Sequence, residues 1–273
     1  MSVNITDLVV RPISEVEALE VIFDTHYSKI MPRLTKHYLG GFIDDRLVGV
    51  MTLGWGTRPV HTIKLLFPSL GTQHYFEIGK MCMLEEMPTN SESVFLSRVI
   101  QWIKDNTTIK VLFTWADGIL GKPGYVYQAA NFMYGGFIWT DLYISDTGEK
   151  VHPRTSQGLS KSEDAKYGHR PTRDELKAKG WNHYRGKQFR YVYFTCDKRE
   201  KKKLLQESPM NWKTPYPKDD ALEWKIQDMD TGAWSDTDNI IYDKTALNTH
   251  STTTTRNRKT IAAVKQMRQF FDF

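Results

Sequence analysis

Three side chains of different chemical types stand at the ends of predicted secondary-structure elements. Asp117 follows a short, mostly apolar strand at Lys110–Trp115, where a sheet delivers catalytic groups, and its carboxylate can accept a proton. His26 and Tyr27 end the first predicted helix and can face the same cleft. With Asp117 they make a nitrogen and oxygen ligand set for a divalent metal such as iron. The simpler alternatives are an Asp-Gly turn and a structural His-Tyr pair.

Basic residues are concentrated in one segment of the chain. Residues 1–150 carry 13 Lys and Arg against 16 Asp and Glu, a net charge of −3, and residues 218–273 carry 8 against 9, a net charge of −1. Residues 151–217 carry 16 against 7, a net charge of +9. This asymmetry indicates an anionic partner held by one region, with a solvated basic surface as the alternative.

Strands and helices alternate along the chain. Apolar and β-branched runs predict strands at Ile5–Arg11, His37–Ile43, Leu47–Leu53, Tyr75–Met83, Lys110–Trp115, Phe137–Ile144 and Arg190–Cys196. Helices are predicted from a Ser14/Glu17 capping box, after the turn 88–93, at Tyr125–Phe132 and at Thr172–Lys179, and a loop is predicted before Tyr75. The short segment Asp44-Asp45-Arg46 between two of these strands is a hairpin signal. The helix after the turn 88–93 has an apolar face made of Phe95, Leu96, Val99, Ile100 and Ile103. A strand-helix-strand crossover around this helix requires a parallel pair within a mixed sheet.

The polar turn 88–93 precedes a helix whose free N–H groups and dipole favour an anion. With the element order, this turn resembles the GNAT acyltransferase superfamily, in which two parallel strands splay apart around the pantetheine of acyl-CoA. The resemblance implies an α/β fold: a mixed, mostly antiparallel sheet flanked by helices, with splayed central parallel strands. It also implies binding of acetyl-CoA or a related acyl-CoA by Lys80, Met81, Asn90, Ser91 and Ser93. The superfamily's glycine-rich loop is absent here, and the alternative is that Asn90 or Ser91 only caps the helix.

A second superfamily feature lies in the helix after the Gly-rich turn. Tyr127, Asn131 and Phe132 match its Tyr-x-x-x-Gly/Asn-Phe pattern. The resemblance implies that the tyrosine protonates the leaving thiolate of CoA and that Asn131 touches the pantetheine. A phenol suits this step because its pKa of about 10 lies close to that of a thiol. Tyr125 is equally well placed, and in the alternative both rings pack on the core.

Several short motifs together resemble the phage Mom family of DNA modification proteins. They are Glu77-Ile78-Gly79-Lys80-Met81, Pro88–Ser93, Trp115-Ala116-Asp117-Gly118, Gly124–Ala129, His26-Tyr27-Ser28, Arg190–Phe194 and Pro215–Lys218. The similarity covers roughly residues 20–218. It implies an acyl-CoA-dependent enzyme that adds a carbamoylmethyl group to the exocyclic amine of adenine and protects phage DNA from restriction. The catalytic residues are then Asp117, Tyr127, Tyr125 and Tyr27. Lys80 stands where many relatives carry Arg, which binds phosphate better.

DNA as the acceptor accounts for the basic segment, because Lys and Arg neutralise phosphates. The expected DNA-binding residues are Lys177, Arg185, Lys187, Lys198, Arg199, Lys201, Lys202 and Lys203. Aromatic residues lie between them, and rings of this kind stack on an extruded base. Taken individually, Tyr191 and Phe194 are predicted to be core residues.

The chain divides into three predicted regions: a GNAT-like core with the cofactor site at 1–150, a DNA-binding basic insert with the last core strand at 151–218, and a partly flexible tail at 219–273. No apolar run has membrane-span length and the start does not read as a signal peptide. Cys82 and Cys196 read as buried free thiols, so the cytoplasm of a bacterial host is expected. The oligomeric state stays open, a homodimer being one form. The rival functions are a GNAT N-acetyltransferase acting on a small amine or a protein, and a non-catalytic DNA-binding module.

Overall fold

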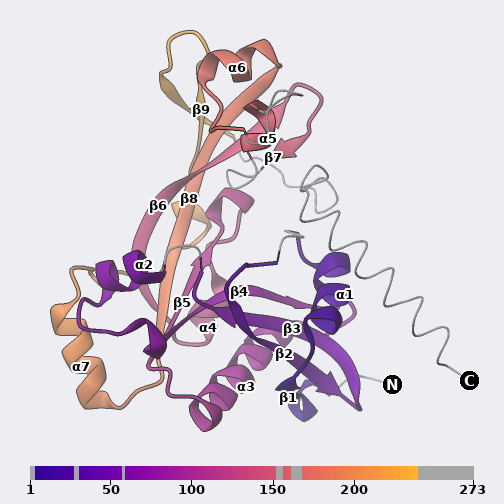
Figure 1. Ribbon diagram of the computed structural model, residues 1–273, viewed down its shortest axis with the longest axis vertical. Helices are drawn as coiled ribbons and strands as arrows, with labels where there is room; N and C mark the ends of the chain where they lie inside the picture. The colour runs from indigo at the N-terminus through magenta and orange to yellow at the C-terminus, as the bar shows by residue number, and fades with distance from the viewer. Residues whose placement is uncertain (1–3, 28–30, 57–58, 152–155, 161–167, 239–273) are drawn as a thin grey trace, which may run out of the picture.

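The computed structural model describes residues 4–27, 31–56, 59–151, 156–160 and 168–238. The strands among these residues form one sheet (Figure 1). The strand order is β1-β2-β3-β4-β5-β8-β6-β7, with β9 paired to β8 and β10 paired to β9. The strands are β1 (Val9–Pro12), β2 (Thr35–Ile43), β3 (Arg46–Gly54), β4 (Tyr75–Met83), β5 (Val111–Ala116), β6 (Met133–Ser145), β7 (Lys150–Val151), β8 (Trp181–Phe194), β9 (Trp224–Gln227) and β10 (Trp234–Thr237).

The parallel strands β4 and β5 separate soon after they meet. They pair at three positions, ending with Glu77 opposite Phe113, whereas β4 extends to Met83 and β5 to Ala116. A register shift against β3 makes Gly79 an extra residue of β4, and such a bulge bends its strand. All other strand pairs are antiparallel. The predicted mixed, mostly antiparallel sheet with splayed central parallel strands is therefore confirmed.

Helices flank both faces of this sheet. They are α1 (Glu15–Thr25), α2 (Pro59–Leu66), α3 (Ser91–Asn106), α4 (Tyr125–Ala129), α5 (Gln157–Ser160), α6 (Arg173–Ala178) and α7 (Lys198–Glu207). On one face, Phe95 of α3 packs in the same cluster as Ile78 of β4, and full burial of such a ring contributes about 2 to 3 kcal/mol. On the other face, Leu204 of α7 packs with Phe113 of β5, and α1 packs around Cys82 of β4.

An arm projects from this body (Figure 1). We define the arm as β6 from Phe137 onward and β8 up to Gln188, together with β7, α6, β9 and β10. Its base lies at Gly135 and Gly136, where the register between β6 and β8 shifts. Gly136 has a φ of 82°, and a Cβ on Gly135 would come within 2.1 Å of a tryptophan ring, so both positions require glycine.

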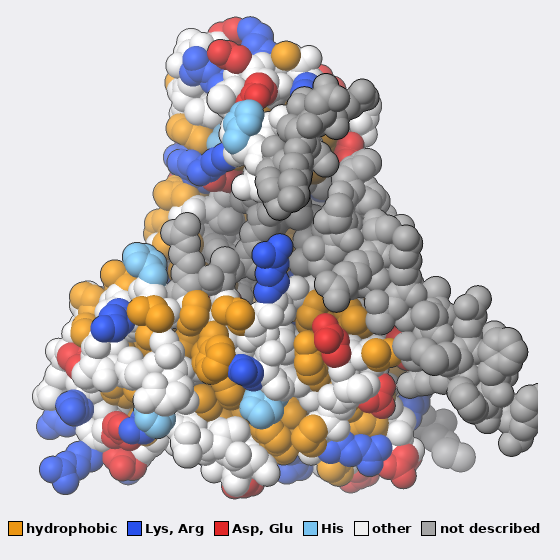
Figure 2. Space-filling view, in the orientation of Figure 1, with side chains coloured by type: hydrophobic (Ala, Val, Ile, Leu, Met, Phe, Trp, Pro, Cys, Tyr) orange, Lys and Arg blue, Asp and Glu red, His pale blue; other side chains and the backbone are white. Residues whose placement is uncertain are grey.

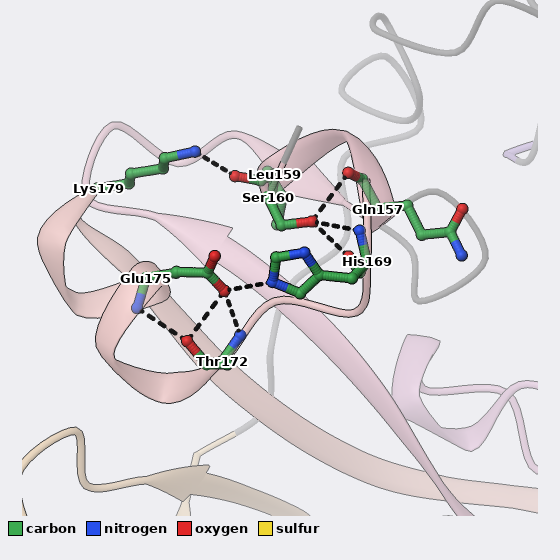
Figure 3. A network of polar contacts seen from close by, with 7 residues as sticks. All are labelled: Gln157, Leu159, Ser160, His169, Thr172, Glu175 and Lys179. Atoms are coloured by element: carbon green, nitrogen blue, oxygen red, sulfur yellow. Dashed lines mark hydrogen bonds and ion pairs between the residues drawn. The ribbon is translucent and has the colours of Figure 1, made fainter. Parts of the chain in front are cut away.

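The tip of the arm is held by polar contacts around the start of α6 (Figure 3). The hydroxyl of Thr172 accepts a hydrogen bond from the N–H of Glu175, whose carboxylate accepts one from the N–H of Thr172 at 2.8 Å. His169 Nε2 lies 3.0 Å from the same carboxylate, and the His169 N–H donates to Ser160 of α5 at 2.9 Å. The contacts with Thr172 and His169 lower the pKa of Glu175 to about 2. The network therefore joins α5 to α6.

Three local predictions are confirmed in detail. Ser14 and Glu17 form the predicted capping box of α1. Asp44 and Asp45, between β2 and β3, have φ values of 48° and 59°, as a two-residue hairpin turn that follows the sheet twist requires. The predicted apolar face of α3 is buried as a set: Phe95, Leu96, Val99, Ile100 and Ile103.

Other predicted elements differ from the structure. The last core strand begins at Trp181 instead of Arg190, because polar residues of β8 pair with β6 along the arm. The first strand begins at Val9, because Ile5–Asp7 form a 3-10 turn capped by Asn4. The segment predicted as a loop contains α2, whose first residue, Pro59, needs no N–H partner there.

The remaining differences concern shorter features. The helix predicted at 125–132 ends at Ala129. Both cysteines are free, but only Cys82 is buried, whereas Cys196 is half-buried at the end of β8. Part of the predicted tail forms the hairpin β9–β10, and β9 pairs with β8 at Tyr184–Gly186. Tail residues from 239 onward lie outside the described residues, as does Ser28 of the His-Tyr-Ser motif.

Candidate active site

The carboxylate of Asp117 lies directly after β5, at the edge where β4 and β5 have separated. The hydroxyl of Tyr27 donates a hydrogen bond to Oδ2, and the side-chain amide of Gln188 donates to Oδ1 at 2.6 Å. The following turn is closed by the backbone instead: the carbonyl of Asp117 accepts from Leu120 and Lys122, at 2.9 and 3.2 Å. The carboxylate is therefore not a turn cap, and it is held by two side chains from distant segments of the chain.

Tyr27 and His26 follow the end of α1 and reach this position as a stacked pair. Their ring centroids are 4.3 Å apart, and His26 is buried. The ammonium of Lys122 lies 4.8 Å from the centroid of the Tyr27 ring. The structure therefore brings the three predicted residues His26, Tyr27 and Asp117 to one place.

This arrangement gives the predicted metal site no support. Within the described ranges, no group of three or more His, Cys, Asp and Glu side chains could hold a metal ion. The two oxygens of Asp117 instead accept hydrogen bonds from Tyr27 and Gln188. The prediction of a metal bound by His26, Tyr27 and Asp117 therefore has no support in the donor set.

The two candidate tyrosines of α4 have different surroundings. Burial raises the pKa of Tyr127 to about 12; a hydrogen bond with Thr114 opposes the rise and the charge of Asp117 adds to it. Tyr125 is exposed, and its hydroxyl donates to Asp219 at 3.0 Å. Burial and the contact with Asp219 raise the pKa of Tyr125. Tyr127 therefore belongs to the surroundings of Asp117, and Tyr125 points to a different carboxylate.

The predicted cofactor residues of β4 lie on opposite faces of the strand. Lys80 is buried on the face that α1 covers, since its neighbour Cys82 packs in the α1 cluster. Met81 packs on the other face, against the cluster that includes α3. The bulge at Gly79 fixes this alternation just where β4 leaves β5.

At the start of α3, the hydroxyls of the two serines predicted to bind an anion donate to backbone carbonyls of their own turn. The hydroxyl of Ser91 donates to the carbonyl of Pro88 at 2.5 Å, and that of Ser93 donates to the carbonyl of Asn90 at 2.8 Å. Asn90 has a φ of 70°, and its side chain makes no capping hydrogen bond. Anion binding here would therefore depend on backbone N–H groups, and Glu92 adds a negative charge to the first turn.

Asn131 lies apart from these positions. It follows α4 with a φ of 59° and is exposed. It lines a small cavity of about 210 Å³ together with Tyr193 of β8 and Lys201 of α7. Asn131 is therefore not gathered with the predicted cofactor residues of β4 and α3 around the point where β4 and β5 separate.

The three predicted DNA-binding cations of the arm are each paired with a carboxylate. Lys177 contacts Asp230, Arg185 lies 3.0 Å from Asp141, and Lys187 lies 2.6 Å from Glu223. Rings cover two of them as well: Arg185 lies 4.3 Å from the ring centroid of Trp234, and Lys187 lies 4.8 Å from that of Phe137. These cations are therefore largely compensated within the arm.

The five predicted cations of α7 have a different setting. They are Lys198, Arg199, Lys201, Lys202 and Lys203. Lys201 is half-buried over the ring of Phe194, at 5.3 Å, and the other four are exposed. In the part of the chain that the structure describes, none of the five forms an ion pair with a carboxylate. Lys and Arg side chains gather at the lower left of Figure 2, where Figure 1 places α7.

Sequence patterns do not predict two features of the structure. The side-chain amide of Gln188 donates to Asp117, but Gln188 lies before Arg190, where the predicted strand begins. Asp141 lies between Arg185 and His183, whose Nε2 is 3.1 Å away. Burial raises the pKa of Asp141, but the contacts with His183 and Arg185 lower it more strongly, to about 2.

Comparison with known proteins identifies the family. A model of the Mom protein family matches residues 7–218. The chain belongs to the Mom protein family. It is 28% identical over 213 residues to the methylcarbamoylase Mom of Escherichia phage Mu, over 78% of this chain and 84% of the phage protein. The family resemblance of the motifs is thereby confirmed.

Solved structures of acetyltransferases are also similar to this Mom-family chain. NAA60 of Arabidopsis thaliana, in complex with acetyl-CoA, is 10% identical over 68% of this chain and 98% of that chain, with a TM-score of 0.40. An N-acetyltransferase from Staphylococcus aureus Mu50 is 12% identical over 69% and 99%, with a TM-score of 0.37. The Mom match ends at Lys218, before β9 and β10. Among the described helices, none has the length and apolar character needed to cross a membrane.

Proposed function

We propose that this Mom-family chain is a DNA modification enzyme that transfers a group from acetyl-CoA or a related acyl-CoA to the exocyclic amine of adenine. One observation carries the proposal. The carboxylate of Asp117 is held by Tyr27 and Gln188 where β4 and β5 separate, with the phenol of Tyr127 close by. Family membership and the basic segment 151–217 support DNA as the acceptor.

Asp117 acts on the acceptor. The lone pair of the adenine amine is delocalised into the ring, so the amine is a poor nucleophile and gains from losing a proton as it attacks. Two donors fix the orientation of the carboxylate, which leaves its remaining lone pairs for an N–H of the amine. The base must leave the duplex to reach this position.

Tyr127 acts on the donor. When bound, acyl-CoA supplies an electrophilic carbonyl carbon and a thiolate leaving group. With a pKa of about 12, the Tyr127 phenol is protonated at neutral pH and can give its proton to the departing sulfur. In such an acyl transfer a nitrogen–carbon bond forms, a carbon–sulfur bond breaks, and Asp117 takes the proton of the amine.

A carbamoylmethyl group needs more than this acyl transfer. Making it from acetyl-CoA requires a nitrogen source for the amide and a two-electron oxidation of the methyl carbon. We therefore assign Asp117 and Tyr127 to proton transfer only and leave the identity of the group to a mass measurement.

Nucleoside mass spectrometry on plasmid DNA from a bacterium that expresses the chain tests the proposal. A modified deoxyadenosine is expected, and its mass distinguishes a carbamoylmethyl from an acetyl adduct. Unmodified deoxyadenosine, with soluble protein present, would overturn the proposal and favour an acetyltransferase of a small amine or a protein.

Variants of single groups test the assigned roles. Asp117→Asn and Tyr127→Phe are expected to lower modification by roughly 100-fold or more, the size of a lost general base or acid. Tyr125→Phe is the matched control for Tyr127→Phe, and it should leave modification nearly unchanged because Tyr125 faces Asp219. Equal losses in both tyrosine variants would contradict the assignment.

A further inference from the structure

The exposed cations of α7 form one stripe along the helix. Lys198, Arg199, Lys202 and Lys203 follow the spacing i, i+1, i+4 and i+5, which places them on one side of a helix. Leu204 on another side is buried in the core beneath α2 and α7. The orientation of the helix is therefore fixed, and the four charges face outward together.

The acidic residues of α7 are engaged elsewhere. Asp197 caps the helix by accepting the N–H of Glu200 at 2.8 Å. The carboxylate of Glu200 lies 2.5 Å from the ammonium of Lys110, and that of Glu207 accepts the hydroxyl of Ser69 at 2.7 Å. All three carboxylates therefore contact the protein body or the helix backbone and leave the cation stripe uncompensated.

The stripe and Gln188, which contacts Asp117, lie on one face of the sheet. Gln188, Val192 and Phe194 alternate on the same side of β8, and the last two pack in the cluster that contains Leu204 of α7. The six residue steps from Gln188 to Phe194 span about 20 Å at roughly 3.3 Å per step. That length corresponds to about six base pairs, since duplex DNA rises about 3.4 Å per base pair.

We propose that the exposed face of α7 binds the phosphate backbone of duplex DNA while the target base lies at Asp117, several base pairs away. The inference rests on the proposed function for its choice of DNA. The stripe supplies four positive charges with no carboxylate in contact, and DNA supplies closely spaced negative charges. An anionic membrane is the less suitable partner, because the apolar side of α7 is buried and has nothing to insert.

Salt-dependent DNA binding by the full-length chain tests this surface. The variant replaces Lys198, Arg199, Lys202 and Lys203 by Gln, and the probe is a labelled duplex oligonucleotide between about 50 and 200 mM salt. We expect binding to weaken about 10- to 100-fold at the lower salt. The slope of log K against log salt should fall by about 2 to 4, since each phosphate contact contributes about 0.9. Replacing the three lysines by Arg should restore binding, because Arg keeps the charge.

The matched control removes four cations from other surfaces. Arg11, Arg46, Arg98 and Lys104 are all exposed, and their replacement by Gln changes the net charge equally. Unchanged affinity in the α7 variant, or an equal loss in the control, would overturn the proposal. So would a selective loss of binding to anionic phospholipid vesicles with DNA binding intact. Failure of the proposed function is separate, since it would leave DNA binding by α7 in place without any modified deoxyadenosine.

Discussion

The arm and α7 are both rich in Lys and Arg, but they differ in where their counter-charges lie. In the arm, each predicted DNA-binding cation meets a carboxylate, and Asp141 alone contacts Arg170 and Arg185. On α7, the carboxylates face the protein and the cations face outward. The difference shows that clusters of basic residues can play two roles. In the arm the cations pair with carboxylates and hold neighbouring segments together, whereas on α7 the positive charge stays available to a ligand.

The largest expected effect comes from removing the carboxylate at the centre of the arm. Asp141→Asn leaves two arginines and His183 around an uncharged group, and we expect the free energy of unfolding in urea to fall by about 3 kcal/mol. Asp236→Asn is the control, because this exposed partner of Lys225 contributes little. If both variants unfold alike, the arm cations are not held as we describe.

Acid should weaken the same cluster. The pKa of Asp141 is lowered from 3.8 to about 2 in the folded protein, so its carboxylate stabilises the fold above about pH 4. That contribution is lost as the pH falls from about 4 towards 2, and it amounts to about 2 kcal/mol. Urea unfolding of the native chain and of Asp141→Asn across this range measures it. The difference between the two proteins should shrink as the pH falls, and a constant difference would contradict the assignment.

A smaller loss is expected from Lys187→Gln. The Lys187 side chain is largely buried and contacts both Glu223 and the carbonyl of Ala221, at 2.6 and 3.1 Å. Losing these charged contacts should lower the free energy of unfolding by about 1.5 kcal/mol. Lys177→Gln is the matched control, since its pair with Asp230 is exposed and should not measurably matter. Greater destabilisation by Lys177→Gln would reverse our ranking of the arm cations.

The smallest effect on stability is expected from α7. Replacing its four exposed cations by Gln should leave the thermal unfolding temperature unchanged within error, because the side chains pair with no carboxylate in the described structure. A clear drop would make these cations structural and would remove the contrast with the arm.

Local signals account for the parts of the fold that the sequence predicts correctly. The capping box at Ser14 and Glu17, the turn at Asp44 and Asp45, and the apolar face of α3 each depend on residues close together in the chain. The position of Asp117 after a buried strand is of the same kind.

Features that depend on distant partners are missed. The part of β8 before Phe189 is too polar to show strand alternation, so neither the arm nor the contact of Gln188 with Asp117 could be predicted. The carboxylates that neutralise Arg185 and Lys187 come from β6 and from the segment before β9. Charge counted along the chain cannot show such pairing, because the partners are 44 and 36 residues away.

β8 carries Gln188 where the arm joins the body and leads into α7 at its other end, so its length sets the distance between the two sites. Because strand residues alternate between faces, one residue inserted between Gln188 and Phe194 would place these two side chains on opposite faces of the sheet. Residues added at the tip of the arm would leave this distance unchanged. We therefore expect added residues to be tolerated at the tip of the arm but not within this part of β8.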